Sequence, residues 1–98
     1  MTHSVFFRPA AHADYADAAR WYEDRALGVG YRFVSNVERA LTLIQDSPQR
    51  VATILKNIRR VRVQGFPFFI YYVIEDSQIV VLAILHARRN PKTWRGRG

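Results

Sequence analysis

The chain has 98 residues, 49% hydrophobic and 13% aromatic, so it can bury one core, has no room for a second, and is too apolar to be disordered throughout. Fifteen lysines and arginines against eight acidic residues give a formal charge of +7, which favours a polyanionic partner, either nucleic acid or an acidic protein. Cysteine is absent, which excludes disulfides, thiolate metal sites and a cysteine nucleophile.

We therefore treat residues 1–98 as a single domain. The N-terminal segment has no basic stretch followed by an apolar one, and the longest apolar run, Ile79 to Leu85, is too short to span a bilayer. We expect no membrane association, and the lack of cysteine fits a cytoplasmic location.

A short β-prone segment, Ser4 to Arg8, comes first. It is followed by Pro9, which cannot continue a central strand but suits the first turn of a helix. Apolar residues then recur at helical spacing as far as Tyr22, which predicts an amphipathic helix that ends near Ala26.

Gly28 and Gly30 break this helix, and a second helix follows with a single apolar stripe. The stripe consists of Phe33, Val37, Ala40, Leu41 and Ile44. Ser47-Pro48 ends the second helix. Two helices joined by a short glycine loop are typical of an antiparallel hairpin that packs on a sheet.

The second half of the chain changes to the period-two pattern of strands. The predicted strands are Ile58 to Val63, Phe68 to Ile74 and Ile79 to Leu85. The fold class is therefore α+β, with an N-terminal strand and a two-helix antiparallel hairpin packed on an antiparallel sheet that ends in a three-strand meander. We expect Arg95 to Gly98 to be a mobile basic tail.

Short motifs accompany these elements. In the first half they are Phe7-Arg8-Pro9-Ala10, Trp21-Tyr22-Glu23, Gly30 with Phe33, and Ser47-Pro48. In the second half they are Arg59-Arg60, Phe66-Pro67-Phe68, Tyr71-Tyr72, Val81 to His86, Arg89, Pro91 and Trp94. Over nearly the whole chain their order and spacing resemble the RelE/ParE toxin superfamily, in particular its ParE-like, plasmid-stabilisation branch.

The resemblance implies the toxin of a type II toxin-antitoxin system, which arrests growth when free. It also implies an acidic, partly disordered antitoxin that folds on binding, and the charge of +7 favours such a partner independently. The implied target is either DNA gyrase or messenger RNA in the ribosome. Only the second target would make the chain an enzyme.

An RNA-cutting toxin needs a base, a group that stabilises the charged phosphorane and an acid. By resemblance, Arg62 matches the phosphate-stabilising arginine of the ribonuclease members, and His86 matches the histidine that ends their last strand. Period-two alternation allows these two side chains to share a sheet face. The set is incomplete, because Ala87 stands where those members often have tyrosine and the strands offer no evident glutamate base; Lys56 is a weak substitute.

A gyrase poison needs a binding surface and no catalytic set, and the C-terminal pattern favours this target. We predict that the surface that binds the target or the antitoxin contains Arg59, Arg60, Arg88, Arg89 and Trp94. Arginine suits this role because its guanidinium makes bidentate contacts with phosphate or carboxylate groups.

Two further interpretations stay open at this point. One is a basic nucleic-acid-binding module without toxin activity, and the other is an inactive toxin homologue. The three histidines lack the spacing and the carboxylates of a metal site, so we expect neither a metal ion nor another cofactor.

Overall fold

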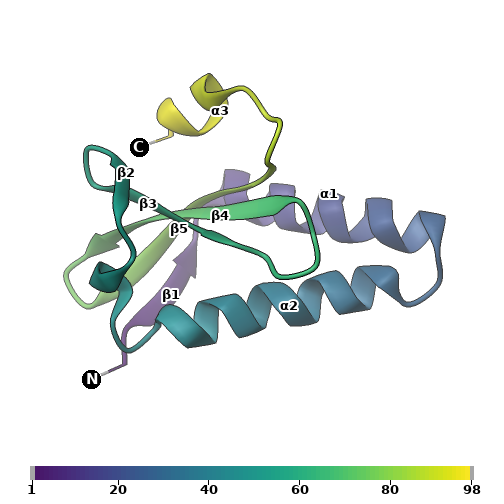
Figure 1. Cartoon of the computed structure of the whole chain (residues 1–98), viewed down its shortest axis with the longest axis horizontal. Helices are drawn as coiled ribbons and strands as arrows, with labels where there is room; N and C mark the ends of the chain where they lie inside the picture. The colour runs from purple at the N-terminus through teal and green to yellow at the C-terminus, as the bar shows by residue number, and fades with distance from the viewer. Residues whose placement is uncertain (1, 98) are drawn as a thin grey trace.

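The computed structural model describes residues 2–97. A five-stranded sheet carries two long helices on one face and a short helix on the other (Figure 1). The elements are β1 (Ser4–Phe7), α1 (Pro9–Arg25), α2 (Val29–Ile44), the 3-10 helix η1 (Pro48–Arg50), β2 (Thr53–Leu55), β3 (Ile58–Arg62), β4 (Phe68–Glu75), β5 (Gln78–His86) and α3 (Pro91–Arg95). The predicted N-terminal strand, helical hairpin and three-strand meander are confirmed.

The strand order is β1-β5-β4-β3-β2. Strands β3, β4 and β5 are antiparallel neighbours, but β1 runs parallel to β5, pairing Ser4 with Gln78 and Phe7 with Val81. The sheet is therefore mixed. Two α-helices and three strands separate β1 from β5 in the chain, and a connection of that length allows the parallel pairing that a tight turn forbids. Strand β2 was not predicted, since three residues are too few to show an alternating pattern.

Both long helices bury the faces that their spacing predicts. All five residues of the α2 stripe, from Phe33 to Ile44, are buried, and α1 contributes buried Ala11 and Ala18. Tyr15 and Tyr22 of α1 pack against the same core. The Tyr22 ring stacks on that of Phe33, and the Tyr15 ring meets the Phe33 ring edge to face. Within residues 2–97, no helix combines the length and apolar character needed to cross a membrane.

The carboxylate of Glu23 holds the turn between α1 and α2. It accepts hydrogen bonds from the backbone N–H of Gly28 at 2.9 Å and of Gly30 at 3.0 Å. Gly28 has a φ of 87°, a left-handed conformation that glycine adopts without strain. The hydrogen bond from Gly28, followed by those from the next amides, lowers the pKa of Glu23 below its ordinary 4.5. The stability that this carboxylate adds is present above that ordinary value and is lost as the pH falls through the lowered pKa.

Each face of the sheet has its own core. The helix-side core joins α1 and α2 to Val63, just after β3, and to sheet residues that include Ile70, Tyr72, Ile79, Val81 and Ile84. The α3-side core contains Ile58, Tyr71, Val73, Val80, Leu82, Ala83, Leu85 and Trp94. Strand β5 contributes to both cores, which explains why its sequence is apolar throughout and does not alternate.

A bulge in β5 changes which residues face each core. Tyr71 pairs with Ala83 and Tyr72 pairs with Val81, so Leu82 has no partner on β4. Leu82 and Ala83 consequently both belong to the α3-side core, although they are adjacent in sequence.

The substitution Gly30→Ala tests the close approach of α1 and α2. Its Cβ would lie 2.5 Å from the Ala19 carbonyl oxygen and 2.8 Å from the Glu23 Cβ, so the helices must separate. We expect the free energy of unfolding to fall by about 1–3 kcal/mol. The control is Gly96→Ala, whose Cβ would meet its nearest neighbour, the Lys92 carbonyl oxygen, at 3.5 Å. Urea denaturation followed by circular dichroism measures both, and equal midpoints for the two variants would contradict the close packing.

Candidate functional site

Arg62 and His86 do not share a sheet face. The Arg62 guanidinium lies 5.9 Å from the ring centre of Phe69, which packs on the α3-side core. The His86 ring lies 5.4 Å from that of Phe68, which packs on the helix-side core. Phe68 and Phe69 are adjacent residues of β4, so their side chains point to opposite faces. The sequence left open whether Arg62 and His86 share a face, and the structure places them on opposite faces.

His86 takes part in the turn that follows β5. Its Nδ1 accepts a hydrogen bond from the backbone N–H of Arg88 at 3.0 Å, and its carbonyl oxygen accepts one from the N–H of Arg89 at 2.9 Å. An Nδ1 that accepts this bond carries no proton, so the ring proton of a neutral His86 is on Nε2. The histidine thereby shapes the path of the chain from β5 towards α3.

Arg59 is engaged within the protein. Its guanidinium donates to the carbonyl oxygen of Gln49 at 2.9 Å and to that of Val51, which fixes η1 and the segment after it against the sheet. The same region is held by Tyr72, whose hydroxyl donates to the Pro48 carbonyl oxygen at 2.9 Å. Burial raises the pKa of Tyr72 to about 12, although the positive charge of Arg59 opposes the rise. Arg59 is thus a structural residue more than a surface contact.

The other predicted arginines are exposed cations. Arg60 lies over the Phe69 ring at 4.1 Å on the α3 side of the sheet, and Arg88 and Arg89 lie after β5. Within residues 2–97 the ion pairs are Arg97 with Asp14 and Arg20 with Asp17, so the exposed arginines of the predicted surface have no carboxylate partner there. Their charge is available to an anionic partner.

Trp94 belongs to the core. Its side chain is 6% exposed and stacks on Tyr71, with ring centres 5.0 Å apart and planes 17° from parallel. It anchors α3 on the sheet, with the Asn90 side chain capping the helix by accepting from the Lys92 N–H at 3.0 Å. Trp94 is therefore a core residue in this structure, and its role in binding stays a prediction.

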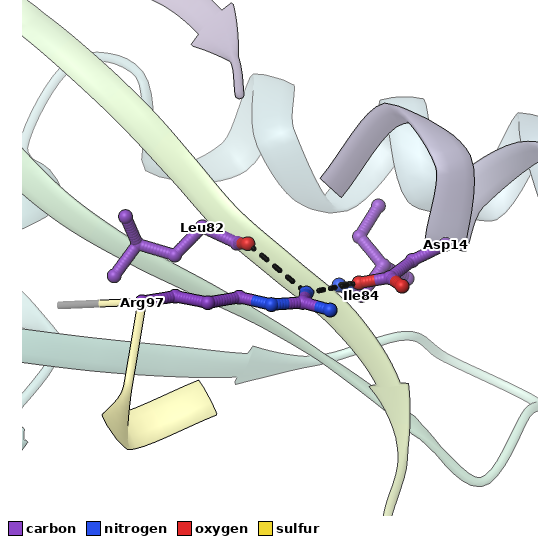
Figure 2. Close-up of polar contacts among 4 residues, drawn as sticks. All are labelled: Asp14, Leu82, Ile84 and Arg97. Carbon is purple, nitrogen blue, oxygen red and sulfur yellow. Dashed lines mark hydrogen bonds and ion pairs between the residues drawn. The ribbon is translucent and has the colours of Figure 1, made fainter. Parts of the chain in front are cut away.

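The expected mobile tail is wrong for Arg97, and Gly98 lies outside the described residues. Figure 2 shows the Arg97 guanidinium between α1 and β5, where it donates to Asp14 Oδ2 at 2.6 Å and to the Leu82 carbonyl oxygen at 3.3 Å. The same Asp14 oxygen accepts from the Ile84 N–H at 3.1 Å. We call Asp14 and Arg97 the C-terminal latch. It was missed because the residues are distant in sequence and share no motif.

The latch closes an edge of β5 that β1 leaves uncovered. The pairing of β1 ends at Val81, with a further bond from the Arg8 N–H to the Val81 carbonyl oxygen at 3.1 Å. Beyond that point the latch supplies the partners of the β5 backbone. Arg97 donates to the Leu82 carbonyl oxygen, and Asp14 accepts from the Ile84 N–H. The side chain of Arg8, the residue between β1 and α1, also donates to the carbonyl oxygen of Arg97, the last described residue, at 2.7 Å.

A groove of about 570 Å³ lies beside the latch, between α1 and the end of β5. Its apolar lining includes Trp21, Tyr22 and Phe68, and its polar lining includes Asp17, His86 and Arg89. The groove brings two predicted residues, His86 and Arg89, together with Trp21 and Tyr22 at the aromatic end of α1. Within the described chain, no group of three or more histidine, aspartate or glutamate residues is arranged to hold a metal ion.

Two solved structures share this fold, a mixed sheet with a helical hairpin on one face. The chain of a chromosomal ParDE toxin-antitoxin system from P. aeruginosa superposes with a TM-score of 0.73 at 17% identity, covering 87% of this chain and 96% of that one. A mutant of the E. coli toxin RelE in the free state superposes with a TM-score of 0.63 at 11% identity, covering 99% and 94%.

The family model for the ParE toxin of the type II toxin-antitoxin system parDE matches residues 5–91. The chain belongs to the ParE toxin family. This confirms the resemblance seen in the sequence motifs. A comparison with curated protein sequences gave no match.

Removing the latch tests its contribution to stability. In Asp14→Ala, Arg97 loses its ion pair and the Ile84 N–H loses its acceptor, so we expect the free energy of unfolding to fall by about 1–2 kcal/mol. Amide exchange at Ile84 should also become faster than at its neighbours. The control is Asp17→Ala, because Asp17 is exposed and its 4.0 Å pair with Arg20 adds little. Equal losses in the two variants would show that the latch does not stabilise the fold.

The two tryptophans should behave differently on truncation. Trp94→Ala removes a buried, stacked side chain, and we expect a loss of about 3–5 kcal/mol of unfolding free energy. Trp21→Ala is the control, since Trp21 is 51% exposed, and we expect a loss under about 1 kcal/mol. Thermal unfolding gives the ranking, and a Trp94→Ala variant as stable as the parent would contradict the anchoring of α3.

Proposed function

We propose that this chain is the toxin of a type II toxin-antitoxin pair, that an acidic antitoxin holds it inactive, and that the free toxin acts on DNA gyrase in the cytoplasm. The observation that carries this proposal is the ParE toxin family match over residues 5–91. The formal charge of +7, with Arg60, Arg62, Arg88 and Arg89 free of carboxylate partners within residues 2–97, supports an acidic antitoxin.

The surroundings of Arg62 favour gyrase over messenger RNA. On its face of the sheet the neighbouring strand positions carry Arg60, Phe69 and Tyr71, and none of these is a general base at neutral pH. The acidic residue of β4 on that face, Glu75, lies six positions beyond Phe69, about 20 Å along the strand. His86 points to the other face. An RNA-cutting mechanism would need an acid and a base beside Arg62, whereas a gyrase poison needs only a surface.

The groove beside the latch and the exposed arginines are the surfaces we assign to binding. The groove has aromatic walls from α1 and β4 and suits the apolar side of an antitoxin segment. Arg88 and Arg89 lie at its C-terminal side and supply charge for the antitoxin or for the cleaved DNA held by gyrase.

The experiment that tests the proposal begins with induction of the chain alone, which should arrest growth. Co-expression of the acidic protein encoded by a neighbouring reading frame should restore growth. The purified chain is then added in parallel to a gyrase reaction and to a translating extract. We expect trapped double-strand breaks in DNA and no codon-phased cuts in messenger RNA.

Matched variants sharpen the result. Arg88→Gln combined with Arg89→Gln should reduce the trapped breaks, whereas Arg20→Gln, on the exposed face of α1, should leave them unchanged. Codon-phased cuts that disappear in Arg62→Ala and in His86→Ala would establish an RNA-cutting toxin in place of a gyrase poison. The absence of growth arrest would indicate an inactive homologue. Duplex binding that weakens by about 0.9 log units per phosphate contact for each log unit of salt, without toxicity, would indicate a nucleic-acid-binding module.

A further inference from the structure

Strand β3 has an open edge beyond its first two residues. Strand β2 pairs with it at Ile58 and Arg59, whereas β4 pairs with it as far as Arg62 (Figure 1). Within residues 2–97, no strand pairs with Arg60–Arg62 on the β2 side. We call residues 60–64 on this side the β3 edge. An unpaired edge exposes backbone groups that can pair with another chain.

The backbone of Arg62 lies at the centre of the β3 edge. The N–H of Val63 donates to the Phe68 carbonyl oxygen at 2.9 Å and therefore points towards β4. Backbone groups of successive residues alternate between the two sides of a strand, so the N–H and C=O of Arg62 point outward. The carbonyl of Gln64 accepts from the Asn36 side chain at 3.0 Å, which marks the end of the open stretch.

On its α3 side the β3 edge is basic. The guanidinium groups of Arg60 and Arg62 both lie near the Phe69 ring, at 4.1 Å and 5.9 Å from its centre. A guanidinium stacked on a ring keeps its N–H groups free at its rim, where they can bind a carboxylate. Within the described residues, neither arginine has such a partner.

On its helix side the β3 edge is partly apolar. A hollow of about 130 Å³ lies between α2 and β3. Leu43, Ala40 and Val61 form its apolar part, and Arg39, Arg62, Asn36 and Gln64 complete its lining. Leu43 is 78% exposed, although it lies on the helix that forms most of the hairpin's core stripe. Side chains of a strand alternate between the two sides, so a chain paired here would place one set beside the arginines and the other beside Leu43 and Val61.

The other sheet edges lack this combination. Strand β1 and the latch cover the outer edge of β5. The free edges of the two outermost strands carry no basic residue within β1 (Ser4–Phe7) or β2 (Thr53–Leu55). A second copy of this chain is a poor occupant of the β3 edge, because it would bring its own Arg60 and Arg62 against like charges.

We propose that the β3 edge binds an extended segment of the antitoxin as an added strand, with acidic side chains beside Arg60 and Arg62 and apolar side chains beside Val61 and Leu43. The segment so defined alternates acidic and apolar residues. This inference rests on the proposed function for the identity of its partner, but the recognition chemistry can be tested without that partner.

The first test is titration of the ¹⁵N-labelled chain with a synthetic peptide, acetyl-Glu-Val-Glu-Val-Glu-amide, followed by NMR. We expect the amide signal of Arg62 to shift and its hydrogen exchange to slow. The amide of Val63, already bonded to β4, should change little. A peptide with lysine in place of glutamate should have no effect. Shifts confined to β1 or to the α1 groove, or no shifts at millimolar peptide, would overturn the proposal.

Variants of Arg60 and Arg62 distinguish the contribution of the backbone N–H to peptide binding from the contribution of the side-chain charge. Arg62→Pro removes the outward N–H, and proline is tolerated on a free strand edge, so we expect the chain to fold and to bind the peptide about tenfold more weakly. Arg62→Gln and Arg60→Gln keep the N–H and should weaken binding about two- to fivefold each. Arg20→Gln is the control on α1. If Arg62→Pro does not fold, the two glutamine variants and the lysine peptide still decide the result.

Failure of the β3-edge proposal and failure of the proposed toxin function give different results. Growth arrest that a neighbouring acidic protein relieves, without slower exchange at Arg62 in the complex or with the peptide, would overturn the β3 edge and leave the proposed function intact. Peptide binding at Arg62 in a chain that does not arrest growth would overturn the toxin function and support the recognition chemistry of the edge.

Discussion

The fold depends on covering strand β5. Its residues Ile79 to Leu85 are all buried, with side chains in the cores on both faces of the sheet. A strand of this kind needs a layer on each face and a neighbour on each edge. The helical hairpin and α3 supply the layers, and β1 and β4 supply the neighbours. Where β1 stops, the C-terminal latch completes the edge, so the N-terminal and C-terminal parts of the chain both serve the same strand.

Sequence patterns predicted the parts of the fold in which neighbouring residues determine the structure. The stripe of α2 and the strands of the meander have periods that survive in the structure. The patterns could not predict the β5 bulge, because a strand that is apolar on both faces has no alternation to interrupt. They also missed α3 and the latch, since Trp94 and Arg97 are fixed by contacts with Tyr71 and Asp14, which lie far away in the sequence.

The candidate site was predicted only in part, because its composition can be read from the sequence but its contacts between distant residues cannot. The excess of basic over acidic residues follows from composition, and the structure adds that Arg60, Arg62, Arg88 and Arg89 are exposed and have no carboxylate partner within residues 2–97. Whether two residues share a face depends on register, and a difference of one position on β4, Phe68 against Phe69, separates His86 from Arg62. Arg59 and Trp94 illustrate a second limit: an arginine and a tryptophan suit a binding surface, but they equally suit a backbone clamp and a core anchor.

The parallel pairing of β1 with β5 has a consequence for how the chain folds. The α1-α2 hairpin and the β3-β4-β5 meander form between near neighbours in sequence, but Ser4 has to find Gln78 across most of the chain. Closing so long a loop is slow compared with forming helices and hairpins. We therefore expect the pairing of β1 with β5 to form after the helical hairpin and the meander. Until β1 docks, β5 has an open edge of apolar residues whose backbone groups can pair with another chain.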